Sequence, residues 1–243
     1  MIGPMSPDAR ESPSRPAPSA TPAPRCEIEA FCLGPFETNC YLVYAAAANG
    51  VSGQPCWIID ASFEPSPMVE RVRELGLKPQ ALLLTHAHVD HIAGVNELLG
   101  AFPGMPVLIH AAEKDWLSNP MLNLSAGAGM RITARGPTAF LEDNQELELS
   151  GTRWRVLHTP GHSPGGVTFY SGGPGVPPVA LVGDALFAGS VGRTDFPGSD
   201  PDLLVRSIGT RLYTLPEETT IYPGHGPTST IGREKRTNPF VRA

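Results

Sequence analysis

The architecture follows from one stretch of the chain, Ala81-Leu82-Leu83-Leu84-Thr85-His86-Ala87-His88-Val89-Asp90-His91. Its four leading apolar residues form a run too short for a helix, which is typical of a strand covered on both faces. His86 and His88 lie two residues apart, so in extended backbone both side chains point to one side. The aspartate and the third histidine follow where a helix begins. This cluster directly after a buried strand predicts a metal site rather than a solvated polar loop.

Three further segments place a ligand-type residue in a glycine-rich loop beside an expected strand. They are Gly161-His162-Ser163-Pro164-Gly165, Gly183-Asp184 and Pro223-Gly224-His225-Gly226-Pro227. Loops at strand ends concentrate catalytic residues, and glycine lets the backbone approach closely. Each segment alone is a weak signal, because a lone Gly-Asp is ordinarily a turn and a lone Gly-His-Gly ordinarily a surface loop. Together with the first stretch, they supply the ligand set that a two-metal site requires.

The expected ligands divide into two groups and a bridge. Three nitrogen ligands for one metal ion come from His86, His88 and His162, while a second ion takes Asp90, His91 and His225, and Asp184 is placed to bridge the two. Asp90 and Asp184 are the expected catalytic residues, because they help to hold the two divalent ions that share a water and lower its pKa. Zinc is the first choice of metal, and iron and manganese also suit mixed imidazole–carboxylate ligation.

Periodicity outside these motifs predicts the fold class. Strands are expected at 26–33, 39–44, 57–60, 81–84, 106–109, 146–149, 153–158, 166–170, 178–182 and 219–222. Helices are expected from Ser66 to Gly76, at 92–99, at 111–117 and at about 201–214, while 118–140 show no clear period. Strands with interspersed helices in both halves indicate two sheets packed face to face with helices outside. We therefore expect an α/β catalytic domain over residues 26–243, an αββα sandwich with the metals at one edge.

Composition limits the other possibilities. Residues 1–25 contain seven prolines and few large apolar residues, so we expect a disordered tail there. The net charge of −6 argues against a nucleic-acid partner. No apolar run is long enough for a membrane helix and no signal peptide is visible, so a cytoplasmic protein is expected. The four cysteines, Cys26, Cys32, Cys40 and Cys56, are expected to be buried or half-buried reduced thiols.

The order of these motifs resembles the metallo-β-lactamase superfamily. Val191-Gly192-Arg193-Thr194-Asp195-Phe196 and the ending Asn238-Pro239-Phe240-Val241-Arg242 are similar to its glyoxalase II, or hydroxyacylglutathione hydrolase, branch in a short bacterial form. The resemblance runs from about Cys26 to the C-terminus. It implies hydrolysis of a 2-hydroxyacyl thioester such as S-lactoylglutathione by a metal-bound hydroxide, with a small-molecule thioester as the partner.

The chain also departs from the full-length family. Only 18 residues follow His225, where full-length glyoxalase II continues into a helical domain that helps to hold glutathione. Pro227 stands where the family has a tyrosine that touches glutathione. Arg193 matches a basic position that binds the glycine carboxylate of glutathione, so we expect it to bind substrate; its alternative role is a solvated charge. The thiol carrier and the oligomeric state stay open.

Two other functions are compatible with the same motifs. One is a persulfide dioxygenase with a single iron, a branch that shares the Gly-Arg-Thr-Asp-Phe segment. A mononuclear site, however, has no need for both His91 and His225. The other is a non-catalytic metal-binding module, which an intact set of seven ligands disfavours.

Four further positions receive structural interpretations. His110 and His158, at strand ends, are expected to form backbone hydrogen bonds. Asp60 is either a turn residue or the acceptor that orients a metal-binding histidine. The basic residues Arg233, Lys235 and Arg236 are expected to form an exposed face.

Overall fold

The computed structural model describes residues 25–45 and 50–242. The expected tail at 1–25 therefore lies outside the described residues, apart from Arg25. The part of the chain that is described contains no helix long and apolar enough to cross a membrane.

The first sheet contains six strands in sequence order. They are β1 (Cys26–Leu33), β2 (Thr38–Ala45), β3 (Pro55–Ile59), β4 (Lys78–Leu83), β5 (Val107–His110) and β6 (Ala139–Leu141). The first three pair antiparallel, and β3 to β6 run parallel. The apolar run that precedes the histidine cluster enters β4, at the centre of this sheet, where both faces are covered. The parallel register brings the carboxyl ends of β3, β4 and β5 to one edge.

The second sheet also has six strands. It runs β14 (Ser229–Thr230), β13 (Thr220–Pro223), β10 (Val176–Gly183), β9 (Val167–Gly173), β8 (Thr152–His158) and β7 (Glu146–Leu149). Strands β10 and β13 pair parallel and all the other pairs are antiparallel. A small hairpin of β11 (Leu186–Phe187) and β12 (Ser190–Val191) follows β10.

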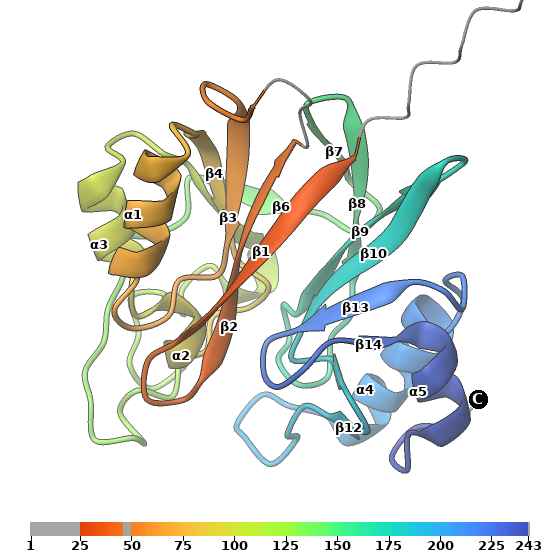
Figure 1. The fold of residues 1–243 in the computed structure, drawn as a ribbon. Helices are drawn as coiled ribbons and strands as arrows, with labels where there is room; N and C mark the ends of the chain where they lie inside the picture. Colours follow the sequence, from red (N-terminus) through yellow and green to blue (C-terminus); the bar gives the residue numbers. More distant parts are fainter. Residues whose placement is uncertain (1–24, 46–49, 243) are drawn as a thin grey trace, which may run out of the picture.

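Helices cover the outer face of each sheet (Figure 1). The first sheet carries α1 (Ser66–Glu74) and α3 (Val95–Ala101), and the second carries α4 (Pro201–Ser207) and α5 (Ile231–Thr237). The short α2 (Val89–Ile92) lies at the edge that holds the histidine cluster, a 3-10 turn spans Ala111–Glu113, and a π-helical turn spans Ile208–Leu212. The expected αββα sandwich is confirmed.

Three apolar clusters hold these layers together. One lies between the two sheets, where Trp57 and Trp154 meet edge to face with ring centroids 6.0 Å apart. The second packs α1 and α3 on the first sheet, and the third packs α4 and α5 on the second. Burial of this apolar surface is the main favourable contribution to folding, and it fixes how the two sheets face each other.

Several local expectations were wrong. The helix expected at 92–99 breaks into α2 and α3 at Gly94, because the N–H of that residue donates to the backbone carbonyl of Ala61, at 2.8 Å, instead of to a carbonyl of the helix. Only a single 3-10 turn forms in the expected helix at 111–117, and the helix expected over 201–214 ends at Ser207 before the π-helical turn. The short strands β6, β11, β12 and β14 and helix α5 were missed. Cys32 is exposed, whereas Cys40 and Cys56 are buried free thiols as expected.

Candidate metal centre

Four loops at one edge of the sandwich carry the seven expected ligands. The loop after β4 and helix α2 supply four of them, and the loop from β8 to β9 supplies His162. Asp184 follows the end of β10, and His225 follows the end of β13. Because β10 and β13 are parallel neighbours, their carboxyl ends lie side by side and bring these two residues together. The structure thus collects in one place all seven side chains that the sequence indicated.

The first group contains the three expected nitrogen ligands. The ring nitrogens of His86, His88 and His162 lie within 4.8 Å of one another, and all three side chains are buried. His88 Nδ1 is 2.9 Å from His162 Nε2, so His88 faces this point with its Nδ1 atom. Three imidazoles that converge in this way are the donor set of a catalytic zinc site, which keeps a further position for water or substrate.

The second group forms around a carboxylate. Asp90 Oδ2 lies 3.1 Å from His225 Nε2 and 3.4 Å from His91 Nε2. The three residues come from α2 and from the loop after β13 and are compatible with one metal ion. Mixed imidazole and carboxylate donors suit zinc, iron and manganese alike, so this group does not select among them.

Asp184 stands between the two groups. Its Oδ1 atom is 3.4 Å from His91 Nε2, and its Oδ2 atom is 3.5 Å from both His162 Nε2 and His225 Nε2. The carboxylate therefore faces histidines of both groups. This placement is the one that a bridging ligand requires.

The buried polar atoms of the centre support a cation there. His86 Nε2, His91 Nε2 and Asp184 Oδ1 are buried without a hydrogen-bond partner, which is rare in folded proteins and is typical of atoms that bind a metal ion. Burial lowers the pKa of His88 to about 3, so its ring is neutral at pH 7 and has a lone pair to donate. Burial alone would lower the pKa of His91, but the three carboxylates around it raise it well above its ordinary value, and this concentration of negative charge favours a bound cation in place of the proton. The residues present therefore fit divalent metal ions.

Hydrogen bonds behind the ligands fix the orientation of the rings. His91 Nδ1 lies 2.8 Å from Asp60 Oδ2, and His162 Nδ1 lies 2.7 Å from the backbone carbonyl oxygen of Arg193. Both rings thus turn Nε2 toward the metal centre, which is the usual arrangement of metal-binding histidines. Of the two roles considered for Asp60, the structure supports the acceptor that orients a histidine.

Three residues of β2 that sequence reasoning missed support the second group. Thr38 Oγ1 lies 3.0 Å from Asp90 Oδ2 and donates to it, while the Tyr41 hydroxyl donates to the carbonyl of Pro223 at 2.6 Å. The Asn39 amide donates to the same carbonyl at 3.0 Å. These contacts join residues more than fifty positions apart, so no local sequence pattern predicts them. The Asn39 and Tyr41 contacts hold the His225 loop against the first sheet, and the Thr38 contact positions Asp90.

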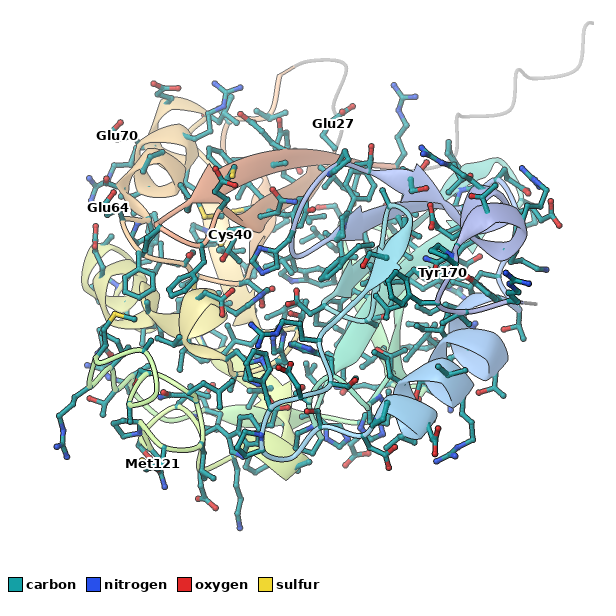
Figure 2. The ribbon with its side chains drawn as sticks, turned by 90° about the horizontal axis from the view of Figure 1, so that it is seen from below. Glu27, Cys40, Glu64, Glu70, Met121 and Tyr170 are labelled. Carbon is teal, nitrogen blue, oxygen red and sulfur yellow. The ribbon has the colours of Figure 1, made fainter. Side chains whose placement is uncertain are left out.

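A cavity of about 590 Å³ opens beside the ligands. Its wall contains His88, Asp90, His162, Asp184 and His225 together with apolar side chains, namely Phe36, Met121, Leu124, Phe187 and Phe196. Met121 is 73% exposed and lies on the long loop before β6 (Figure 2). A mostly apolar pocket with a few converging polar groups is the usual form of a small-molecule site.

Arg193 lines this cavity, although its guanidinium already has an internal partner. Arg193 Nη2 lies 2.7 Å from Asp195 Oδ2, and Nε lies 2.9 Å from Asp195 Oδ1, so the pair is bidentate. The guanidinium carbon is 4.3 Å from the ring centre of Phe196. Both charged side chains are about two-thirds exposed. The arginine thus lies beside the pocket, between Asp195 and the ring of Phe196.

The remaining histidines lie outside the ligand set. His110 and His158 stack with ring centroids 4.1 Å apart. His158 Nε2 lies 3.0 Å from the carbonyl oxygen of Pro164, and His110 Nδ1 accepts a hydrogen bond from the backbone of Ala112. These backbone contacts match the structural role expected for both.

An αββα sandwich with a buried histidine–aspartate cluster at one edge defines a class of metal-dependent enzymes. The family model described as the metallo-beta-lactamase superfamily matches residues 33–225, and the chain belongs to that superfamily. It is 38% identical over 212 residues to the probable metallo-hydrolase YqgX of Bacillus subtilis, across 86% of this chain and 94% of that protein. It is 37% identical over 222 residues to hydroxyacylglutathione hydrolase GloC of Haemophilus influenzae, across 89% and 98%.

A solved structure agrees with this assignment. The chain is 40% identical in sequence to the protein in the crystal structure of TTHA1623 in a di-iron-bound form. The two structures superpose with a TM-score of 0.73. The match covers 88% of this chain and all of the other. The chain is accordingly a metallo-hydrolase of the metallo-β-lactamase superfamily.

Proposed function

We propose that this metallo-hydrolase cleaves a 2-hydroxyacyl thioester such as S-lactoylglutathione. The observation that carries the proposal is the convergence of seven ligand side chains beside a cavity of about 590 Å³ that also contains one arginine. The similarity to a hydroxyacylglutathione hydrolase over nearly the whole of that protein supports the substrate class.

We propose two divalent ions per chain, with zinc as the first choice and iron or manganese as alternatives. His86, His88 and His162 would hold one ion, Asp90, His91 and His225 the other, and Asp184 would contact both. The di-iron form of a relative at 40% identity supports the number. At such a site, two divalent ions supply activation of water and polarisation of a carbonyl oxygen.

The residues of this chain provide the remaining parts of the reaction. Asp90 and Asp184 place carboxylate oxygens beside the histidines, where they can accept hydrogen bonds from the attacking water. Phe187 and Phe196 form an apolar wall that excludes bulk water and receives uncharged parts of the substrate. Arg193 binds a carboxylate of the thiol carrier at the margin of the pocket. A thiolate leaves readily, because thiols have a pKa of about 8.5, so the reaction needs no strong general acid.

The test measures two activities on one preparation of known metal content. We expect purified enzyme to hydrolyse S-lactoylglutathione and to consume no oxygen with glutathione persulfide. Oxygen uptake without thioester cleavage would replace the proposal with the persulfide dioxygenase. Absence of both activities in metal-loaded protein would favour a binding module. A β-lactam serves as a third substrate, because the superfamily also contains enzymes that open that ring.

A further inference from the structure

A buried carboxylate outside the ligand set connects two of the ligand loops. Glu113 lies in the 3-10 turn after β5 and is completely inaccessible to solvent. Its Oε2 atom accepts a hydrogen bond from the backbone N–H of Ala87 at 2.6 Å, and its Oε1 atom accepts one from the backbone N–H of Gly165 at 2.7 Å. Burial of a carboxylate without hydrogen-bond partners destabilises a protein, so glutamates are rarely fully buried unless specific donors contact them.

The two partners of Glu113 are adjacent to ligands. Ala87 lies between His86 and His88, and Gly165 lies three residues after His162. These loops come from different sheets, since one follows β4 and the other joins β8 to β9. A single side chain thus holds the two loops that supply all three imidazoles of the first group. A backbone hydrogen bond from Val167 to Thr85, at 2.9 Å, also joins these two loops.

The sequence around Gly165 allows this contact. A Cβ atom at that position would stand 2.8 Å from Cγ and 2.9 Å from Cδ of Glu113, closer than carbon atoms pack. The glycine therefore lets the carboxylate reach the backbone amide. This residue has no positive φ angle, so an alanine there would be compatible with the backbone, and the three atoms nearest to its Cβ would all belong to the glutamate side chain.

We propose that Glu113 is a positioning residue for the metal ion of the first group. Its carboxylate sets the distance between the loop that carries His86 and His88 and the loop that carries His162. This inference rests on the proposed metal site and does not depend on the substrate. Hydrogen-bond partners behind metal ligands commonly change metal affinity by about 10- to 100-fold, which is the effect expected here.

The test compares zinc binding in matched variants of the full chain. Glu113→Gln keeps the shape of the side chain but turns an amide NH₂ toward one of the two backbone N–H donors. Glu234 provides the control, because it is equally buried and accepts hydrogen bonds from the backbone of Gly189, at 2.8 Å, from Asn238, at 3.0 Å, and from the Ser229 hydroxyl, none of which is adjacent to a ligand of the first group. Metal is stripped with a chelator, and zinc alone is then titrated against a chromophoric competitor.

We expect Glu113→Gln to weaken one of the two zinc-binding steps about 10- to 100-fold and to leave the other within about threefold. Glu234→Gln should lower the melting temperature of the metal-free protein and leave both steps unchanged. Equal effects of the two variants on zinc affinity, or no effect of Glu113→Gln, would overturn the proposal and leave Glu113 with a role in folding only.

Gly165→Ala tests the same contact from the other side if Glu113→Gln does not fold. It should weaken the same zinc-binding step by displacing the carboxylate, and unchanged zinc binding in this variant would also overturn the proposal. Because the readout is zinc affinity, the result decides the role of Glu113 whether or not the wild-type chain cleaves thioesters. Failure of the substrate proposal would appear separately, as zinc-loaded protein without thioesterase activity.

Discussion

Nδ1 of His91 lies 2.8 Å from Oδ2 of Asp60, and both side chains are withdrawn from solvent. The same carboxylate accepts hydrogen bonds from the backbone N–H and the hydroxyl of Thr85, each at 2.7 Å. Asp60 has a φ of 58°, in the left-handed region that Asp and Asn adopt more readily than other residues with a side chain. It joins the end of β3 to the ligand loop and turns Nε2 of His91 toward Asp90 and Asp184.

Asp60→Asn is expected to weaken metal binding about 10- to 100-fold while the protein stays folded. Asparagine tolerates the positive φ angle, but it replaces the charged acceptor behind His91 with a neutral amide. Titration of metal-stripped protein with zinc measures the change. Asp200→Asn is the matched control, since Asp200 caps α4 by accepting from the N–H of Leu203 and an asparagine caps equally well. Equal zinc affinities in the two variants would contradict the orienting role of Asp60.

Asp184→Ala is expected to lower turnover by several orders of magnitude without unfolding the protein. The carboxylate faces histidines of both ligand groups, so its loss removes the group proposed to contact both ions. Turnover is measured with metal in excess, and the circular dichroism spectrum shows whether the fold is intact. Near wild-type turnover under those conditions would show that Asp184 is only a turn residue.

The purified protein is expected to contain close to two metal ions per chain. Seven ligand-type side chains converge, whereas one catalytic metal needs only three or four protein ligands. Elemental analysis after growth in metal-replete medium gives the count. A single iron with no second metal would contradict the proposal of two metal ions and favour the persulfide dioxygenase.

Arg193→Ala is expected to raise KM for S-lactoylglutathione several-fold and to leave kcat nearly unchanged. The contact would be remote from the scissile bond and equal in ground and transition states. The effect is modest because the guanidinium is largely exposed and already paired with Asp195. Steady-state kinetics with a neutral thioester provide the control, since that substrate should be indifferent to the change.

Asp195→Asn is the companion to that variant. It frees the guanidinium of Arg193 from its bidentate partner, so KM for the anionic thioester should fall or stay constant. A rise in KM equal to that of Arg193→Ala would mean that the ion pair itself shapes the pocket. An unchanged KM in Arg193→Ala would make the arginine a surface charge and remove the main support for a glutathione carrier.

Much of the fold could be predicted from local sequence patterns. Strands β1 and β7 have the expected bounds, and the other expected strands formed with bounds that differ by a few residues. Alternating apolar residues indicate strands because the side chains of a strand point to opposite faces, one of which packs on the core. Continuous apolar runs indicate strands that are covered on both faces. The two-residue strands β11, β12 and β14 have no measurable period. They exist because neighbouring backbone offers hydrogen bonds, so no local signal predicts them.

The sequence by itself determined which side chains are able to bind metal, because three histidines and an aspartate stand within six residues and the other candidates occupy glycine-rich loops. Tertiary structure alone decided how they meet. His88 and His162 are 74 positions apart, yet their ring nitrogens lie 2.9 Å from each other once the sheets pack face to face. Glu113 lies in a turn whose pattern gives no hint of burial. Its partners, the N–H groups of Ala87 and Gly165, belong to two loops that only the packed core brings together.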